Sequence, residues 1–136
     1  LGVESQLPVD LYDNGVEHVY VVLGSREEVA ALKPDAKVLA VFGVGINCSA
    51  GEGERWKTRM FHPGAGVDED PATGSAAGPL ALHLARHGRI ALGAEIEIEQ
   101  GTEIGRPSRL YARAHDAERI DVGGSAVVVA RGEFRL

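Results

Sequence analysis

Residues 59–88, RMFHPGAGVDEDPATGSAAGPLALHLARHG, decide the fold of this chain. They read as a short strand, a glycine-rich acidic loop and a helix. Apart from Ser75, residues 74–82 carry no polar side chain, and a helix that is apolar on all sides is buried on all sides. We therefore predict a buried helix over residues 75–87, ended by Gly88 in the left-handed conformation that stops helices.

The start of this helix predicts an anion site. Proline is tolerated in the first helical turn, where backbone N–H groups have no partner, so Pro79 puts the helix start within residues 73–78. The unpaired amides of Gly74, Ser75 and Ala76, at the positive end of the helix dipole, would bind a small anion or a carboxylate. Asp70 lies beside them in the sequence.

Length and composition indicate one folded α+β domain, residues 1–136. Hydrophobic residues make up 44% and charged residues 25% of the chain, values ordinary for a globular protein. A net charge of −6 without a Lys/Arg cluster argues against a nucleic-acid surface or docking on a membrane. The lone Cys48 fits a cytoplasmic protein. The chain begins with Leu1 rather than methionine, so we expect a piece of a longer protein.

The other elements follow from hydrophobic periodicity and turn residues. Strand candidates are residues 18–23, 46–49, 56–61, 95–100 and 108–114, with a hairpin of residues 120–122 and 125–131 over Gly123-Gly124. Short helices are predicted over residues 25–32 and 35–41. Short strands at this spacing predict a mostly antiparallel sheet that curls around the buried helix.

Several motifs resemble the phenazine-biosynthesis PhzF-like family. They are Phe61-x-Pro63, Gly66-Val67, the run EDPATGSA at residues 69–76, Gln100-Gly101 and GRPS at residues 105–108. The resemblance extends over nearly the whole chain and is to the C-terminal half of these two-half proteins. It implies half of a diaminopimelate-epimerase-like fold, with the active site between the two halves.

The resemblance also implies roles for individual residues. Asp70 would lie at the active site and position the substrate and the proton carrier, while the amides of Gly74 and Ser75, with the Ser75 hydroxyl, would hold a substrate carboxylate. The family's glutamate proton carrier and a histidine belong to the first half, in Ser-Glu-Thr-like and Gly-His-Ala-Thr-like motifs. Neither motif occurs in this chain.

Each candidate also has a plain structural interpretation. Asp70 can simply cap the loop before the helix. Ser75 can be a helix cap. It is not expected to be a nucleophile, because the Gly-x-Ser-x-Gly elbow is missing, and its loop is not expected to bind ATP, because no lysine follows the glycine. His83 and His87 have the i, i+4 spacing of metal ligands but no third ligand nearby in the sequence, so we predict a solvated pair and no metal site.

The remaining charged residues near the site are ambiguous from the sequence. Glu69 is predicted to be a solvated or structural charge, and Arg59 to form a salt bridge, with carboxylate binding as the alternative. Arg106 is a possible partner of Asp70 in a rigid bend formed by residues 100–108, and His62 is left without a role.

Two functions remain open. The first is a cofactor-independent isomerase or epimerase that moves a proton on a small carboxylate-bearing metabolite, for example in biosynthesis. The second is a non-catalytic module that binds a small acid or completes a partner's fold. In both, we expect the chain to pair with the missing N-terminal half or with a copy of itself, and to be nearly inactive alone.

Overall fold

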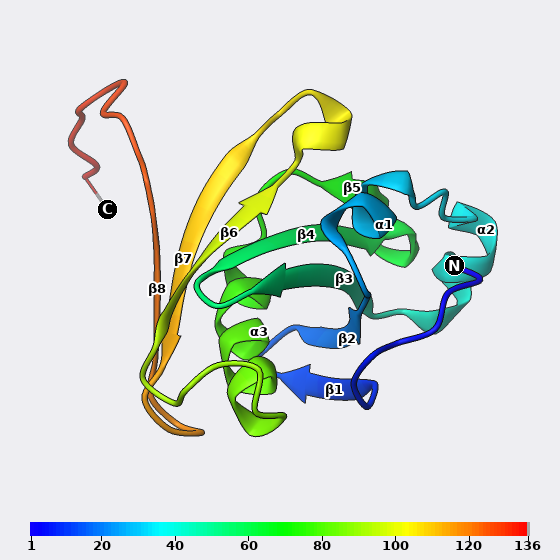
Figure 1. The fold of residues 1–136 in the computed structure, drawn as a ribbon. Coiled ribbons are helices and arrows are strands. Elements are labelled where there is room, and N and C mark those ends of the chain that lie inside the picture. Colours follow the sequence, from blue (N-terminus) through cyan, green and yellow to red (C-terminus); the bar gives the residue numbers. More distant parts are fainter. Residues whose placement is uncertain (136) are drawn as a thin grey trace.

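The computed structural model describes residues 1–135, which form a curled mixed sheet with α-helices on both of its faces (Figure 1). The strands are β1 (Asp10–Asp13), β2 (Glu17–Val22), β3 (Gly45–Glu52), β4 (Arg55–His62), β5 (Val67–Asp70), β6 (Glu95–Gln100), β7 (Ser108–Ala114) and β8 (Ile120–Gly124). The α-helices are α1 (Arg26–Ala31), α2 (Ala36–Leu39) and α3 (Gly74–Arg86); short 3-10 turns cover Ala40–Phe42, Pro63–Ala65 and Thr102–Ile104.

The sheet runs in the order β1-β2-β3-β4-β6-β7-β8, and β5 pairs with β4. The pairs β2–β3 and β4–β6 are parallel and the other pairs are antiparallel. Between β4 and β6 the chain makes β5 and the whole of α3, so this crossover places the helix against the sheet. The expected curled, mostly antiparallel sheet is therefore present, with β6, β7 and β8 turned toward α3 (Figure 1).

Helix α3 lies in the concavity of the sheet, where it packs mainly on β7 and β8. Every residue from Ala76 to Leu84 is buried, which confirms the burial predicted from the apolar pattern. Ile96 and Ile98 of β6 face the same core, as the alternation of that strand predicts. Gly88 takes a φ of 69° after the last turn, in agreement with its predicted role as the stop.

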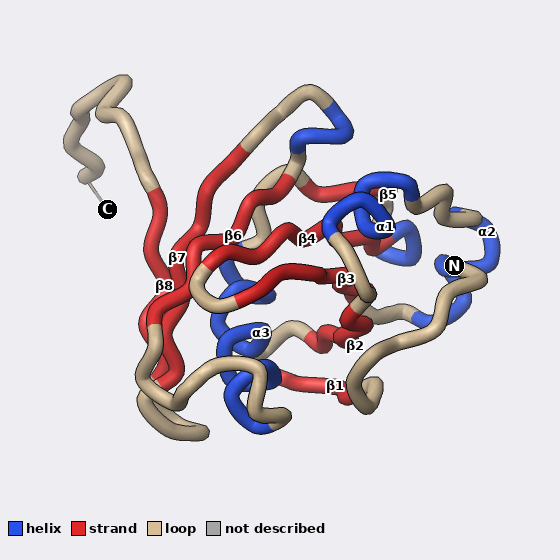
Figure 2. Tube along the Cα trace, in the orientation of Figure 1, coloured by secondary structure: helices blue, strands red, loops and turns tan. Residues whose placement is uncertain are grey.

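A second apolar core lies on the opposite face of the sheet and includes side chains of α1 and α2. Helix α1 lies over this face (Figure 2). Strand β2 supplies both cores because successive side chains point to opposite faces. Tyr20 and Val22 join the α3 side, whereas Val21 and Leu23 join the α1 side. Ser25 caps α1 by accepting a hydrogen bond from the Glu28 amide at 3.1 Å. The sheet is thus covered on both faces at β2, β3 and β4.

The predicted hairpin over Gly123-Gly124 is wrong. These glycines belong to β8, where they pair with Tyr111 and Leu110 of β7. The chain reverses earlier, between β7 and β8, where the His115 amide donates to the Arg119 carbonyl at 3.0 Å. Residues 125–135 lie outside the strands and are exposed, and they lead away from the body of the sheet (Figure 1). Although this segment has the composition of a strand, it pairs with no other strand within residues 1–135.

Helix α3 starts within the predicted residues 73–78, but the predicted place of Pro79 in its first turn is wrong. Thr73 is the N-cap and Gly74 the first helical residue, so Pro79 is inside the helix rather than in its first turn. Proline cannot donate to the carbonyl four residues earlier, here that of Ser75. The side chain of Asn14 donates to this carbonyl instead, at 2.9 Å. No helix within residues 1–135 has the length and apolar character needed to cross a membrane.

Candidate active site

Asp70 is the last residue of β5 and is held by a side-chain network before α3. Its Oδ2 accepts a hydrogen bond from the Thr73 hydroxyl at 2.6 Å. The buried Gln100, at the end of β6, donates to the Asp70 carbonyl at 2.7 Å and to the Thr73 hydroxyl oxygen at 2.9 Å, and accepts from the Thr73 amide at 3.2 Å. Gln100 thereby fixes the residues on both sides of Pro71-Ala72, and the half-buried Asp70 carboxylate keeps a defined place at the helix start.

Two of the three predicted amides are available at the start of α3. The Ala76 amide donates to the Thr73 carbonyl at 3.1 Å, so Ala76 is not a free donor, and the prediction fails for this residue. The cause is local: the first helical turn closes tightly on the Thr73 carbonyl, which also accepts from Ala77. The amides of Gly74 and Ser75 have no acceptor within residues 1–135. Gly74 is exposed and Ser75 half-buried, so an anion can approach both.

Ser75 is inside the helix, and its hydroxyl is fixed by a residue that the sequence did not single out. His18, on β2, lies with its Nε2 3.0 Å from the Ser75 Oγ. Thr73, not Ser75, is the N-cap, so the alternative of Ser75 as a cap is excluded. The contact joins residues 57 positions apart, and no local pattern in the sequence indicates it.

The surroundings of His18 keep its imidazole buried and neutral. Gly45, on the neighbouring strand β3, leaves room for the ring, because a Cβ at this position would lie 2.4 Å from the His18 Nδ1. Asn47, also on β3, places its Nδ2 3.3 Å from the same nitrogen. Burial lowers the pKa of His18, and the nearby His62 lowers it further. A neutral His18 can exchange a hydrogen bond with Ser75 without adding charge.

Glu69 and Arg59 form a structural ion pair beside the site. The Arg59 guanidinium donates to both carboxylate oxygens of Glu69, at 2.9 and 2.7 Å, and both side chains are nearly buried. The remaining Arg59 nitrogen donates to carbonyls at the end of α1, including that of Leu32 at 2.8 Å. The structural interpretation of both residues is confirmed, and Arg59 has no free donor face for a substrate.

Arg106 does not pair with Asp70. Its side chain is exposed, and within residues 1–135 it forms no ion pair with that carboxylate. Its amide donates to the Gly101 carbonyl at 2.9 Å, so the bend predicted for residues 100–108 is present. Gly101 has a φ of 80°, and a Cβ there would lie 2.8 Å from the Pro71 carbonyl oxygen. The bend therefore packs directly on the Asp70 loop, and its contact with Asp70 comes from Gln100, through the Asp70 backbone carbonyl, and not from Arg106.

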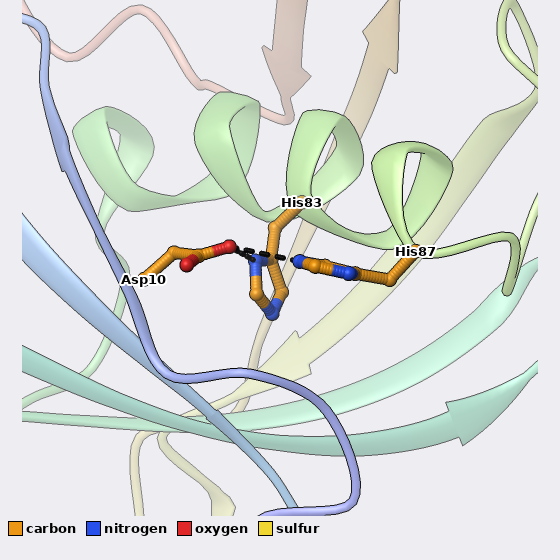
Figure 3. Close-up of side chains that lie close together, drawn as sticks. All are labelled: Asp10, His83 and His87. Atoms are coloured by element: carbon orange, nitrogen blue, oxygen red, sulfur yellow. Dashed lines mark hydrogen bonds and ion pairs between the residues drawn. The ribbon is translucent and has the colours of Figure 1, made fainter.

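The prediction of a solvated pair at His83 and His87 is wrong for His83, which is fully buried. Strands β1 and β2 cover the last turns of α3, and Tyr12 and Tyr20 pack on the imidazole of His83. Burial lowers the pKa of His83 to about 4. Asp10 of β1 reaches both histidines from the side (Figure 3). These three side chains could hold a metal ion, but they lie at the opposite end of α3 from Ser75.

Relatives match nearly the whole chain but only about half of their own length. The trans-2,3-dihydro-3-hydroxyanthranilate isomerase of Pseudomonas chlororaphis is 52% identical over 142 residues, which cover 100% of this chain and 51% of the relative. The enzyme of the same name from Pseudomonas aeruginosa is 53% identical over 137 residues, covering 97% of this chain and 49% of the relative. The chain thus spans about half the length of these relatives.

Solved structures show the same fold. A PhzF-family protein from Bacillus anthracis superimposes with a TM-score of 0.70 at 24% identity, over 85% of this chain and 44% of its own. A PhzC/PhzF protein from Clostridium difficile gives a TM-score of 0.68 at 24% identity, over 96% of this chain and 48% of its own. The model of the phenazine biosynthesis-like protein family, PhzC-PhzF, matches residues 1–132. The chain therefore belongs to the PhzC-PhzF family of phenazine biosynthesis-like proteins, whose named relatives are isomerases.

Proposed function

We propose that this chain is the C-terminal half of a cofactor-independent isomerase that moves a proton on a small carboxylate-bearing metabolite. One observation carries the proposal: the fixed Asp70 carboxylate precedes a helix start at which the Gly74 and Ser75 amides lack acceptors within residues 1–135. Two N–H groups at the positive end of a helix bind a carboxylate well. The same dipole stabilises negative charge that develops on the substrate as a proton leaves.

Each residue then has a distinct role. The Gly74 and Ser75 amides and the Ser75 hydroxyl bind the substrate carboxylate. Asp70, held by Thr73 at 2.6 Å, orients the substrate and accepts a hydrogen bond from it. His18 is a positioning residue, since it contacts the Ser75 hydroxyl 3.0 Å away rather than the substrate.

The substrate class follows from the relatives. The enzymes that are 51–53% identical to this chain are named for trans-2,3-dihydro-3-hydroxyanthranilate, a carboxylic acid. A carboxylate of this kind fits the two free amides. We therefore propose this compound, or a close analogue, as the substrate.

The proton carrier would come from a second half, which also completes the site. Exposed apolar side chains on residues 125–135 support such pairing: Val127 is 84%, Val129 90% and Phe134 95% exposed. An extended segment with this composition is suited to adding a strand to another sheet. We infer that it packs on the missing N-terminal half, or on a second copy of this chain about a two-fold axis.

The test is a chimera in which the N-terminal half of the P. chlororaphis relative precedes this chain. We expect the chimera to isomerise trans-2,3-dihydro-3-hydroxyanthranilate and to incorporate deuterium from D₂O, and the 136-residue chain alone to show little of either activity. Asp70→Asn in the chimera should lower kcat by at least about a hundredfold, because it removes a charge at the reacting centre.

Matched variants separate the roles. Asp68→Asn removes an exposed carboxylate of the same strand and should leave kcat unchanged. Ser75→Ala should raise KM more than it lowers kcat, since it removes a contact to the bound carboxylate. An Asp70→Asn chimera as active as the parent would refute the proposed role. An inactive parent chimera that still binds the acid would favour a non-catalytic binding module.

A further inference from the structure

We propose that Asp10, His83 and His87 form a binding site for a divalent cation of the zinc type, which ties β1 to the last turns of α3 (Figure 3). The proposal concerns a site at the opposite end of α3 from Asp70 and is independent of the proposed isomerase activity. It rests on the arrangement of three ligand atoms, their burial and their chemistry.

The three ligand atoms have the spacing of a metal site. They all lie within 4.8 Å of one another. The Asp10 Oδ2 is 2.8 Å from the His87 Nε2 and 3.5 Å from the His83 Nδ1. In a tetrahedral zinc site with bonds of about 2.0–2.1 Å, ligand atoms are about 3.3 Å apart. Both distances from the Asp10 oxygen are therefore within about half an ångström of the spacing in such a site.

The His83 imidazole is held in place before any ion binds. Its ring stacks on Tyr20 at a centroid distance of 5.7 Å and meets the edge of Tyr12 at 5.7 Å. The Tyr12 hydroxyl lies 3.2 Å from the His83 Nδ1. When this hydroxyl turns its proton away, the Nδ1 lone pair is free to face the Asp10 carboxylate oxygen, 3.5 Å away. A cation between two such electron pairs is attracted by both, and burial keeps the imidazole neutral, the form that binds metals.

The donor set indicates the type of ion. Imidazole nitrogen suits Zn²⁺, Co²⁺ and related ions, whereas Mg²⁺ and Ca²⁺ prefer oxygen ligands. Two histidines and one carboxylate leave a fourth coordination position for water. The side chains of His87 and Asp10 are 23% and 41% exposed, so water and the ion can reach the site from solvent.

The place of the site suggests a structural role. His87 follows Ser75 by 12 residues, about 18 Å along a helix, too far for the ion to contact a substrate at the Gly74 and Ser75 amides. Asp10 begins β1, and Asn14, directly after the other end of this strand, donates a hydrogen bond to the Ser75 carbonyl near the start of α3. A cation would fix the second end of this strand on the helix.

The competing arrangement is the ion pair between Asp10 and His87 without a metal. The neighbouring Arg86 is a fixed cation that lies over the Tyr12 ring at 5.3 Å and attracts Asp10. Arg86 repels a second cation, so Arg86→Gln should tighten metal binding.

The experiment is a titration of the chelator-treated chain with Co²⁺, followed by visible absorption, and with Zn²⁺ in competition with a chromophoric chelator. We expect one saturable site, with the intense visible bands of low-coordinate Co²⁺ and a higher melting temperature with Zn²⁺. Asp10→Asn and His87→Gln should each weaken binding by at least about tenfold, since even loss of a residue that only supports a ligand costs this much.

These two variants avoid the buried His83, and circular dichroism would verify that each is folded. His115→Gln is the matched control, because His115 pairs with Asp121 at 2.7 Å in an exposed hairpin elsewhere on the chain. Retained binding in this control, with loss in the other two, supports the site. Absence of saturable binding in the parent chain, or equal binding in the parent, Asp10→Asn and His87→Gln, overturns the proposal.

Discussion

Replacing Gln100 with glutamate exchanges one amide nitrogen for an oxygen at the centre of the network that holds Asp70. Gln100 is 1% exposed, and its Nε2 donates at 2.7 Å to the Asp70 carbonyl and at 2.9 Å to the Thr73 hydroxyl oxygen. The Thr73 proton is already used, since it points to the Asp70 carboxylate. An ionised glutamate at this position would therefore place a charged oxygen against two acceptors with no proton between them.

The size of the effect can be worked out from these contacts. The two lost hydrogen bonds contribute about 1 kcal/mol each, and burying the charge adds several kcal/mol. Protonation limits the total: with an unfolded-state pKa of about 4.3, keeping the carboxyl neutral at about pH 8 costs at most about 5 kcal/mol. We expect Gln100→Glu to lower the free energy of unfolding by about 3–5 kcal/mol at about pH 8.

The pH dependence has a definite sign. The buried carboxyl has a folded-state pKa raised above its unfolded value, so the unfolded state binds fewer protons, and the variant regains stability as the pH falls. Near pH 5 the protonated acid can donate to the Asp70 carbonyl and still accept from the Thr73 amide. The loss relative to the parent chain should then shrink to about 1–2 kcal/mol.

The assay is urea unfolding at about pH 8, 6.5 and 5, followed by the fluorescence of Trp56, the single tryptophan, which is buried. Gln6→Glu is the matched control because Gln6 is exposed, and its effect should stay within about 0.5 kcal/mol at each pH. Equal stability of Gln100→Glu and the parent chain at about pH 8, or a loss that does not change with pH, would refute the reasoning about the Asp70 loop.

Two further predictions concern α3. Leu84→Ala should lower the free energy of unfolding by about 2–5 kcal/mol, because Leu84 is fully buried, whereas Leu92→Ala, at a position 59% exposed, should cost less than about 0.5 kcal/mol in the same urea experiment. In the presence of a chelator, stability should fall by up to about 3 kcal/mol between pH 6.5 and 4, because the His83 pKa of about 4 makes the unfolded state bind more protons in this range. His83→Gln should flatten this part of the profile, because Asp10, His87 and Arg86, the charged groups that act on His83, stay in place. An unchanged profile would show that His83 does not cause the loss of stability.

The sequence predicted the elements whose signals are local. The apolar run of α3 and the alternation of β6 depend on which side chains lie next to one another along the chain, and both agree with the structure. Asp70, Gly74 and Ser75 fall within six residues, so their proximity follows from a single loop and helix start. Asn14-Gly15, a favoured hairpin dipeptide, would also have indicated the β1–β2 hairpin that brings Asp10 opposite Tyr20.

The partners of these residues were decided by the tertiary structure. His18 contacts Ser75 across 57 positions, Gln100 contacts Thr73 across 27, and Asp10 reaches His87 across 77. Each contact depends on the order and register of strands in the curled sheet, which no local pattern encodes. Periodicity in the sequence determines which face of an element is buried. The hydrophobic effect depends only on the apolar area removed from water, so it needs no particular partner or bond angle. A hydrogen bond requires its donor and acceptor at about 3 Å with correct angles, and only the packed sheet and helix fix those positions.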